Sequence, residues 1–342
     1  MDKMKVAMYY NNNDIRIEEM PIPKIDDNEI LVKVQVCGIC GSDVMEWYRI
    51  KKAPKVLGHE MAGDIVKIGK NVKKFKVGDR IFVSHHVPCN SCNFCINDQH
   101  TLCKTLHSTN FYPGGFAEYL KVPEINIDSG VFILPKEISY EEGAFIEPLA
   151  CVVRGLRIAG MKSNQTVLVI GSGVAGLLNI KLAKAIGASR IFATDIDDYR
   201  LNSAKKMGAD FVINAKDDVP EEVKKRNNGN LADIVILCAG VKSAARQAMM
   251  SVEKGGTILL FAPTEPGVEI PFPMFDLWNK QVKIVSTYAG APRDLEEAIE
   301  LIKSKKVKVI DMITHRFPLS KAGEAFILAA KAKESIKIII KP

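Results

Sequence analysis

The chain has 342 residues, enough for two domains, and its content of 47% hydrophobic and 25% charged residues is ordinary for a globular protein. Lysines spread along the chain produce the formal net charge of +7, and no aromatic residues alternate with them, so we expect no nucleic-acid partner. No apolar run reaches the roughly 20 residues of a membrane span, and the first residues lack the features of a signal peptide. We therefore expect a cytoplasmic protein with no membrane partner.

The first third of the chain has the pattern of antiparallel β-structure. Apolar and polar residues alternate through residues 1–36, and Pro21 and Pro23 confine the first segment to a sheet edge or a turn. Glycines divide residues 58–83 into short strands, which is typical of a small β-barrel. We expect no long helix before about residue 139.

Three separate segments carry the residue types that bind a catalytic metal ion. Cys40 lies in CGICGSD, His59 and Glu60 lie in VLGHEMAGD, and Glu147 lies in IEPLACVV. A thiolate, an imidazole and a carboxylate are the ligand set of a catalytic zinc, which keeps one position for water or substrate. From spacing alone, the alternative is a buried cysteine and an ordinary core histidine.

Four further cysteines crowd into one short segment with the spacing Cys89-x2-Cys92-x2-Cys95-x7-Cys103. Four thiolates this close together form a tetrahedral site without an open position, so the metal pins a lobe of the chain and does no chemistry. Zinc is the expected metal, because iron–sulfur clusters use comparable spacings but are uncommon in a chain of this organisation. Metal ligation in a reducing compartment explains these cysteines better than a disulfide framework does.

The second half of the chain changes to an alternation of strands and helices. Six short apolar runs predict the strands of a doubly wound parallel sheet, at residues 167–170, 191–194, 211–213, 234–238, 257–261 and 283–287. Two helices are predicted near residues 294–306 and 320–334. A last strand at 336–340 lies outside the six, so we expect it to return to the N-terminal β-domain.

A glycine-rich turn joins the first of these six strands to a helix. Gly171 makes the tight turn, Gly173 lets the backbone approach a pyrophosphate, and Gly176 lets the helix pack close to the strand. Val174 lies within the same motif, GSGVAG, and completes the predicted cofactor contacts of this turn. An ordinary glycine-rich turn is the alternative, which the strand, turn and helix order disfavours.

The second strand of the predicted sheet ends in an acidic residue, Asp195. A carboxylate at this offset accepts hydrogen bonds from an adenosine ribose and repels a 2′-phosphate. Arg200 is expected near the adenosine, where it supports Asp195. These residues predict that the cofactor is NAD and not NADP.

In this order, the motifs resemble those of the zinc-containing medium-chain alcohol dehydrogenases, and the resemblance covers essentially the whole chain. The matching segments are GICGSD, GHE, GDR, the four-cysteine lobe, GGFAEY, EPLA and GSGVAG. The resemblance implies an α/β fold with a GroES-like β-domain and a Rossmann domain built on a doubly wound parallel sheet. It places the GroES-like catalytic domain at residues 1–150, completed by 291–342, and the NAD-binding domain at 151–290. It also implies two zinc ions per chain.

The resemblance assigns roles to the residues of the dispersed constellation. Cys40 and His59 are implied zinc ligands, and Glu60 and Glu147 share the remaining carboxylate ligand, since family members differ over which of them binds the metal. Ser42 is the hydroxyl that takes the proton of the alcohol.

One departure from the family pattern concerns the proton path. Many relatives carry a histidine, which passes the proton on to solvent, at the position that Met45 occupies in this chain. A thioether cannot carry a proton, so either water or a neighbour such as Glu46 serves, or the step is slower.

Two histidines precede the four-cysteine lobe and are candidates for substrate binding. His86, three residues before Cys89, is similar to the threonine dehydrogenase pattern, whereas GSDV and EPLACVV are closer to sorbitol and other polyol dehydrogenases. His85 and His86 at the rim of a pocket would hydrogen-bond a polyol or, when protonated, offset a carboxylate. The alternative is that both are solvated loop residues.

The sequence thus predicts a zinc-dependent enzyme that transfers hydride between a small secondary alcohol, a polyol or vicinal diol, and NAD. Oxidation of a hydroxy amino acid, as by L-threonine 3-dehydrogenase, is the alternative. A zinc-free reductase or a non-catalytic NAD-binding relative would usually lack Cys40, His59 or the cysteine lobe. We expect a homo-oligomer, either a tetramer or a dimer.

Overall fold

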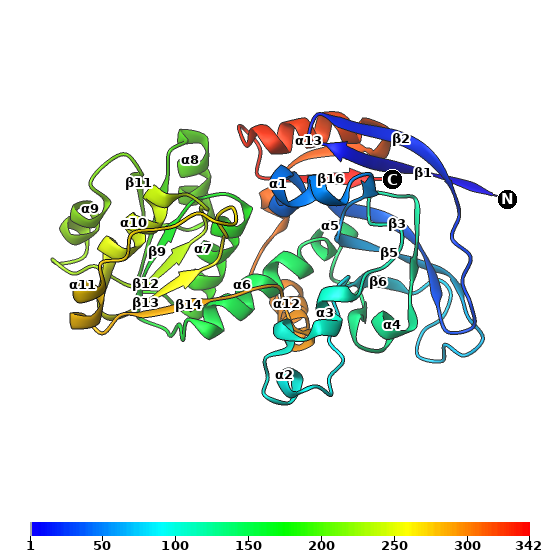
Figure 1. The fold of residues 1–342 in the computed structure, drawn as a ribbon, viewed down its shortest axis with the longest axis horizontal. Coiled ribbons are helices and arrows are strands. Elements are labelled where there is room, and N and C mark those ends of the chain that lie inside the picture. Colours follow the sequence, from blue (N-terminus) through cyan, green and yellow to red (C-terminus); the bar gives the residue numbers. More distant parts are fainter. Residues whose placement is uncertain (1) are drawn as a thin grey trace. The chain divides into compact units, whose positions relative to one another are not determined.

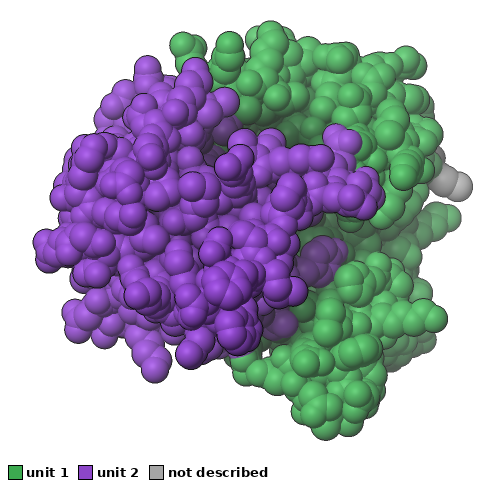
Figure 2. All heavy atoms as spheres, turned by 60° about the vertical axis from the view of Figure 1, so that its left-hand side comes forward, with its two compact units in different colours: residues 1–150, 290–342 green, residues 151–289 purple. Residues whose placement is uncertain are grey.

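The computed structural model describes residues 2–342, which divide into two compact units, coloured separately in Figure 2. The first unit contains the chain up to Ala150 together with Gly290–Pro342, and the second contains Cys151–Ala289. Helix α6 (Ile146–Ile158) carries the chain from the first unit into the second. Within the described chain, no helix has both the length and the apolar character that a bilayer crossing requires.

Two sheets form the framework of the first unit (Figure 1). The larger has the strand order β15-β16-β3-β5-β6-β8, with β7 paired to β3, and the smaller has the order β2-β1-β4. The strands of the larger sheet are β3 (Ile30–Gly38), β5 (Glu60–Ile68), β6 (Arg80–Val83), β7 (Tyr119–Val122), β8 (Val131–Ile133), β15 (Ile313–Pro318) and β16 (Lys337–Lys341). Those of the smaller are β1 (Lys3–Asn11), β2 (Asp14–Pro21) and β4 (Lys55–Val56).

The helices of the first unit are mostly short and lie in the connections between strands. None of those before α6 exceeds seven residues, as the sequence predicted. The α-helices are α1 (Glu46–Arg49), α2 (Asn93–Ile96), α3 (Lys104–Ser108), α4 (Glu124–Gly130), α5 (Tyr140–Gly143), α12 (Pro292–Lys303) and α13 (Ala322–Lys331). Single 3₁₀ turns are η1 (Gly41–Val44), η2 (Ile50–Lys52), η3 (His100–Leu102), η4 (Ile310–Met312) and η5 (Leu319–Lys321).

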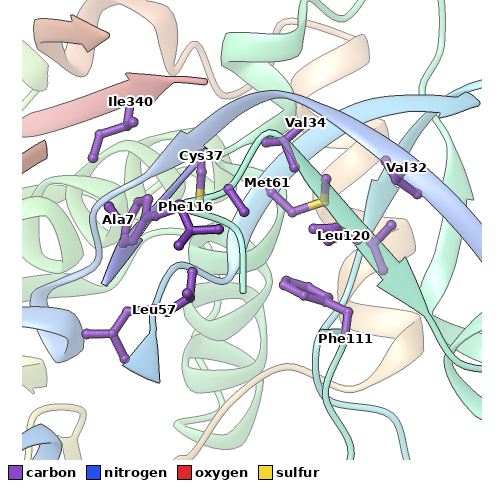
Figure 3. Close-up of a cluster of buried hydrophobic side chains, with 14 of the residues drawn as sticks. Ala7, Val32, Val34, Cys37, Leu57, Met61, Phe111, Phe116, Leu120 and Ile340 are labelled. Atoms are coloured by element: carbon purple, nitrogen blue, oxygen red, sulfur yellow. The ribbon is translucent and has the colours of Figure 1, made fainter. Parts of the chain in front are cut away.

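An apolar core holds the first unit together, and segments distant in sequence contribute to it. Figure 3 shows Cys37 of β3, Met61 of β5 and Ile340 of β16 among the buried side chains, all at most 2% exposed. Strand β16 pairs antiparallel with β3, which confirms that the last predicted strand returns to the N-terminal sheet. Residues near the end of the chain are therefore needed to complete the sheet that the first residues begin.

The second unit is a six-stranded parallel sheet with the order β11-β10-β9-β12-β13-β14 (Figure 1). This order, with the first strand central, is that of a doubly wound nucleotide-binding domain. Its strands are β9 (Thr166–Ile170), β10 (Arg190–Asp195), β11 (Phe211–Asn214), β12 (Ala232–Leu237), β13 (Val252–Leu260) and β14 (Lys283–Ser286). Its helices are α7 (Val174–Ile186), α8 (Asp198–Met207), α9 (Val219–Arg226), α10 (Lys242–Ser251) and α11 (Met274–Asn279).

All six predicted strands are present, and one begins earlier than predicted. Strand β13 starts at Val252, five residues before the predicted start at Thr257, and its pairing with β12 shifts register in between. The extra residues include Gly255 and Gly256, which weaken the strand pattern in the sequence. Because parallel crossovers are right-handed, α7 and α8 cover one face of the sheet and α9 and α10 the other.

Candidate active site and metal centres

The four cysteines of the lobe converge on one point. One ligand atom from each lies within 4.8 Å of those of the others, and the sulfur atoms are 3.6 Å apart in both the Cys92–Cys95 and the Cys103–Cys89 pairs. A disulfide would need about 2.05 Å, whereas four sulfurs around one zinc ion lie roughly 3.8 Å apart. The geometry therefore fits a tetrahedral zinc site and excludes disulfides here.

The protonation of these thiols also fits a cation site. Hydrogen bonds from the backbone and hydroxyl of Ser91 and the backbone of Cys92 lower the pKa of Cys89 to about 5. Burial raises the pKa of Cys95 to about 12, so without a cation the cluster retains protons. A divalent ion displaces such protons, because the thiolate is the form that binds metal.

A second cluster lies where two neighbouring strands of the first unit meet. Strands β3 and β5 pair antiparallel with Gly38 opposite Glu60, so the residues just past the end of β3 lie beside those at the start of β5. Cys40 follows β3, His59 directly precedes β5, and the ligand atoms of these two residues and Glu60 lie within 4.8 Å of one another. The structure thus brings together three of the four dispersed candidates, with the thiolate, imidazole and carboxylate that suit zinc.

Buried Asp43 orients this cluster. Its carboxylate accepts a hydrogen bond from the backbone of Cys40 at 3.1 Å and lies 3.5 Å from Nδ1 of His59, and its side chain is 0% exposed. Burial opposes ionisation, but His59 and the guanidinium of Arg49 lower the pKa of Asp43 below its usual value. A carboxylate on Nδ1 leaves Nε2 of His59 to bind a metal, the arrangement common around ligating histidines.

Glu60 has a second partner that competes for its oxygens. Lys337 of β16 is 0% exposed and donates from Nζ to Oε2 of Glu60 and, at 3.2 Å, to the carbonyl of Ile39. Gly38 leaves room for this pair, since a Cβ there would lie 2.5 Å from Oε2 of Glu60 and 2.6 Å from Cε of Lys337. Burial disfavours the charged ammonium, yet the carboxylate of Glu60 outweighs it and raises the pKa of Lys337.

The remaining candidates around this cluster are placed as follows. Ser42 lies next to the cluster, with Oγ 3.4 Å from the sulfur of Cys40. Glu147 lies in the first turn of α6 and is not among the three residues whose ligand atoms converge. Glu46 accepts a hydrogen bond from the backbone of Asn12 at 3.1 Å.

The two candidate substrate histidines extend the cluster. The ring of His85 lies 4.8 Å from that of His59 and 3.8 Å from that of His86, measured between centroids. Burial and the neighbouring histidines lower the pKa of His85 well below its usual value, and burial and His59 lower that of His86 to about 3. Nδ1 of His85 is buried and has no hydrogen-bond partner within the described chain. Both rings are therefore neutral near pH 7.

The glycine-rich turn of the second unit has the geometry that phosphate binding requires. Gly171 has a φ of +94°, and a Cβ on Gly176 would lie 1.9 Å from the carbonyl oxygen of Gly171. A Cβ on Gly173 would meet only Nη1 of Arg200, at 3.9 Å, so the backbone in front of helix α7 is accessible. Val174 begins α7, whose first amide groups carry the positive end of the helix dipole.

Asp195 is held in place by the backbone around it. Its Oδ2 accepts from the amide of Ser172 at 2.8 Å, and its Oδ1 accepts from the amides of Ile196 at 2.8 Å and Asp197 at 3.1 Å. Arg200 lies 3.9 Å away. A carboxylate has about four acceptor positions, so one is left for a ribose hydroxyl.

Comparison with known proteins agrees with this geometry. Residues 26–129 match the alcohol dehydrogenase GroES-like domain, and residues 174–304 match the zinc-binding dehydrogenase family. The chain is 34% identical to sorbitol dehydrogenase of Gallus gallus, covering 98% of this chain and 95% of that protein. It resembles the structure of 2R,3R-butanediol dehydrogenase from Bacillus subtilis, with 30% identity, a TM-score of 0.86 and 99% of each chain covered. It also resembles an NADP-bound protein of Sinorhizobium meliloti assigned as a zinc-binding dehydrogenase, with 28% identity, a TM-score of 0.90 and 100% of each chain covered.

The fold is that of a zinc-binding dehydrogenase with a doubly wound nucleotide-binding domain. The chain belongs to the zinc-containing medium-chain dehydrogenase family, as the motifs indicated. The expected fold class, a GroES-like β-domain with a Rossmann parallel sheet, is confirmed.

Sequence reasoning missed three residues around the cluster. Asp43 follows Ser42 in the GSD motif, and an acidic residue so close to a candidate ligand was an available signal. Arg49 contacts Ser42, but no spacing rule identifies that contact. Lys337 is the first residue of an apolar strand. A lysine buried at such a position indicates an oppositely charged partner, but the sequence pattern does not identify which residue that is.

Proposed function

We propose that the protein is a zinc-dependent oxidoreductase that transfers hydride between a secondary alcohol, a polyol or vicinal diol, and NAD. The observation that carries this proposal is the convergence of Cys40, His59 and Glu60 beside the Ser42 hydroxyl. Family membership supports two zinc ions per chain, one in the cysteine lobe and one at this cluster.

At the proposed catalytic centre, each residue has a definite role. Cys40, His59 and Glu60 would hold zinc, which when bound supplies a Lewis acid that favours the alcoholate form of the substrate. Ser42 accepts the proton of the alcohol at Oγ while its own hydroxyl proton passes on to water or to a neighbour such as Glu46. Asp43 keeps the imidazole of His59 in the tautomer and orientation that ligation requires.

We propose that Glu60 is the carboxylate ligand in the resting enzyme. Its ligand atom converges with those of Cys40 and His59, whereas that of Glu147 does not. Lys337 engages Oε2 of Glu60 and leaves Oε1 for the metal. Glu147 remains the alternative carboxylate when Glu60 turns wholly toward Lys337.

Neutral histidines favour a polyol over a hydroxy amino acid. His85 and His86 are half-buried, and their lowered pKa values keep both uncharged at pH 7. A neutral imidazole offers one hydrogen-bond donor and one acceptor, which suit a hydroxyl, but no charge to offset a carboxylate. The buried and unpartnered Nδ1 of His85 supports this assignment, as do the names of the sorbitol and butanediol dehydrogenases that the chain resembles.

The proposed cofactor is NAD. The turn of Gly171, Gly173, Val174 and Gly176 would receive the pyrophosphate. Asp195, supported by Arg200, would accept from a ribose hydroxyl, and its carboxylate would repel a 2′-phosphate. The NADP bound to the S. meliloti relative makes this preference a point to be measured.

A single substrate panel tests the function. Purified enzyme is assayed with neutral polyols, vicinal diols and hydroxy amino acids, each with NAD and with NADP, at the nicotinamide absorbance. We expect polyols or diols to have the highest kcat/KM, and NAD to be preferred by roughly tenfold or more. Faster oxidation of a hydroxy amino acid would support the threonine-type alternative, and equal use of NADP would refute the role given to Asp195. Absence of oxidation across the panel would refute the function.

We propose that the enzyme is a homo-oligomer. Strand β14 lies at the edge of the parallel sheet, and strongly exposed apolar side chains gather on and before helix α11, at Phe272 (51%), Met274 (68%), Phe275 (71%) and Trp278 (71%). Such a patch beside an open sheet edge fits a second copy of the chain. Light scattering is expected to give two or four times the chain mass of 37.7 kDa, whereas a monomeric mass would refute the proposal.

We also propose that the protein works in the cytoplasm. All eight cysteines are free thiols, and four of them form the lobe cluster. Thiols in this number stay reduced in that compartment.

A further inference from the structure

Arg49 bridges the Ser42 hydroxyl and the carboxylate that orients His59. Its Nε donates to the carbonyl of Ser42 and its Nη2 to Oγ of Ser42, both at 2.9 Å, while Nη2 also lies 3.4 Å from Oδ1 of Asp43. The side chain is only 15% exposed. One guanidinium therefore contacts both Ser42, which lies beside Cys40, and Asp43, which lies beside His59.

The local fold directs Arg49 to this position. The carbonyl of Met45 accepts from the amides of Tyr48, at 2.9 Å, and Arg49, at 3.1 Å, which closes the single turn of α1. This turn places the side chain of Arg49 next to Ser42, seven residues earlier in the chain. The guanidinium carbon lies 4.8 Å from the centroid of the Tyr48 ring, a contact that further limits its movement.

The chemistry of the guanidinium limits what it can do for the reaction. An arginine donates hydrogen bonds but does not accept a proton, so Arg49 is no substitute for the relay histidine that Met45 replaces. By occupying one lone pair of the Ser42 oxygen, it leaves that hydroxyl one acceptor position and its own proton. Its fixed positive charge opposes any net positive charge on Ser42, so the hydroxyl's own proton must leave as the alcohol's proton arrives.

We propose that Arg49 is a positioning residue for the dehydrogenase. Its contact with Ser42 holds the Ser42 hydroxyl toward the substrate, and its contact with Asp43 holds the Asp43 carboxylate against His59. The inference rests on the proposed function. The contact with Ser42 should affect kcat, and the contact with Asp43 should affect how firmly His59 retains the metal.

The first test is a double-mutant cycle with Ser42. Arg49→Met is expected to lower kcat for polyol oxidation roughly 10- to 100-fold while changing KM less than about threefold, because a charged hydrogen bond near the reacting atoms is lost. In a Ser42→Ala background the same change should lower kcat less than about threefold. Arg49→Lys, which keeps the charge but not the forked geometry, should restore part of the loss.

The second test measures the metal and needs no catalysis. Zinc loss to a chelator is expected to be on the order of three- to tenfold faster in Arg49→Met, with or without Ser42→Ala, because Asp43 is less firmly held. Lys52→Met is the matched control, since Nζ of Lys52 lies 5.3 Å from the centroid of the same Tyr48 ring, whereas the hydrogen bonds of Ser42 in the described chain involve Arg49 and Cys40. Lys52→Met should change neither kcat nor the rate of zinc loss, and thermal melting checks that each variant is folded.

The outcomes separate this inference from the proposed function. Equal losses of kcat for Arg49→Met in the two backgrounds, or zinc loss at the wild-type rate, would overturn the inference. The same would follow if Lys52→Met reproduced the effects of Arg49→Met. If wild-type enzyme oxidised no alcohol, the proposed function would fail, and the zinc-loss rates would still decide whether Arg49 supports Asp43.

Discussion

Cys40→Ser is expected to remove one of two zinc ions per chain and to lower alcohol oxidation by a factor of roughly 1,000 or more, since the Lewis acid leaves with the metal. Cys40 follows strand β3, is only half-buried and does not belong to the apolar core cluster of the first unit, so the fold should survive. Elemental analysis, kcat and thermal melting report these three effects separately.

Cys92→Ser is the matched control for this prediction. Cys92 belongs to the four-cysteine lobe cluster, where the proposed zinc would cross-link a short segment and take no part in the reaction. The substitution should also remove one zinc ion, but it should lower thermal stability and leave turnover of the folded fraction near the wild-type value. If Cys40→Ser kept both zinc ions, the assignment of Cys40 as a ligand would be wrong.

Lys337→Met is expected to destabilise the protein by roughly 3–5 kcal/mol, because it leaves the carboxylate of Glu60 buried without its cationic partner. Glu60 is 1% exposed, so water cannot readily replace the ammonium. For a unit of this size the loss corresponds to a fall in Tm on the order of 10 °C. Denaturant unfolding and thermal melting both measure it in protein without zinc at this cluster, because a bound zinc ion would itself compensate the carboxylate.

Two further variants show whether the ion pair is responsible. Glu60→Gln combined with Lys337→Met should recover part of the stability, because the uncompensated charge is gone. Lys341→Met removes another lysine from the same strand, where Lys341 is 48% exposed and pairs with Glu141, and should cost less than about 1 kcal/mol. Equal destabilisation by the two single lysine substitutions would argue against a special role for the buried pair.

Much of the architecture could be predicted because local patterns determine it. The segments that form β9 and β10 are largely apolar, and glycines with this spacing between a strand and a helix commonly bind the phosphates of a nucleotide. The four lobe cysteines fall within 15 residues, so their convergence needs little long-range structure. Patterns of this kind are read from neighbouring residues alone.

The detail of the catalytic cluster could not be predicted in this way. Lys337 and Glu60 are 277 residues apart, and only the pairing of β16 with β3 and of β3 with β5 brings them together. The direction of Arg49 depends on a single helical turn, which has no periodic pattern. Whether Glu60 or Glu147 is the carboxylate ligand likewise depends on the ion pair between Lys337 and Glu60. Residue spacing alone could not decide between the two carboxylates.

The return of β16 to the first sheet affects how the chain folds as it is synthesised. The second unit is one continuous segment, so it can complete its sheet while Gly290–Pro342 are still to be made. The first unit cannot, because β16 and its Lys337 follow the whole second unit in the sequence. Until β16 has been made, Glu60 lacks its lysine, and the end of β3 at Cys37 and Gly38 lacks the partner strand β16. A nascent chain is thus exposed to mispairing at the larger sheet of the first unit until β16 is made, which is later than the completion of the parallel sheet of the second unit.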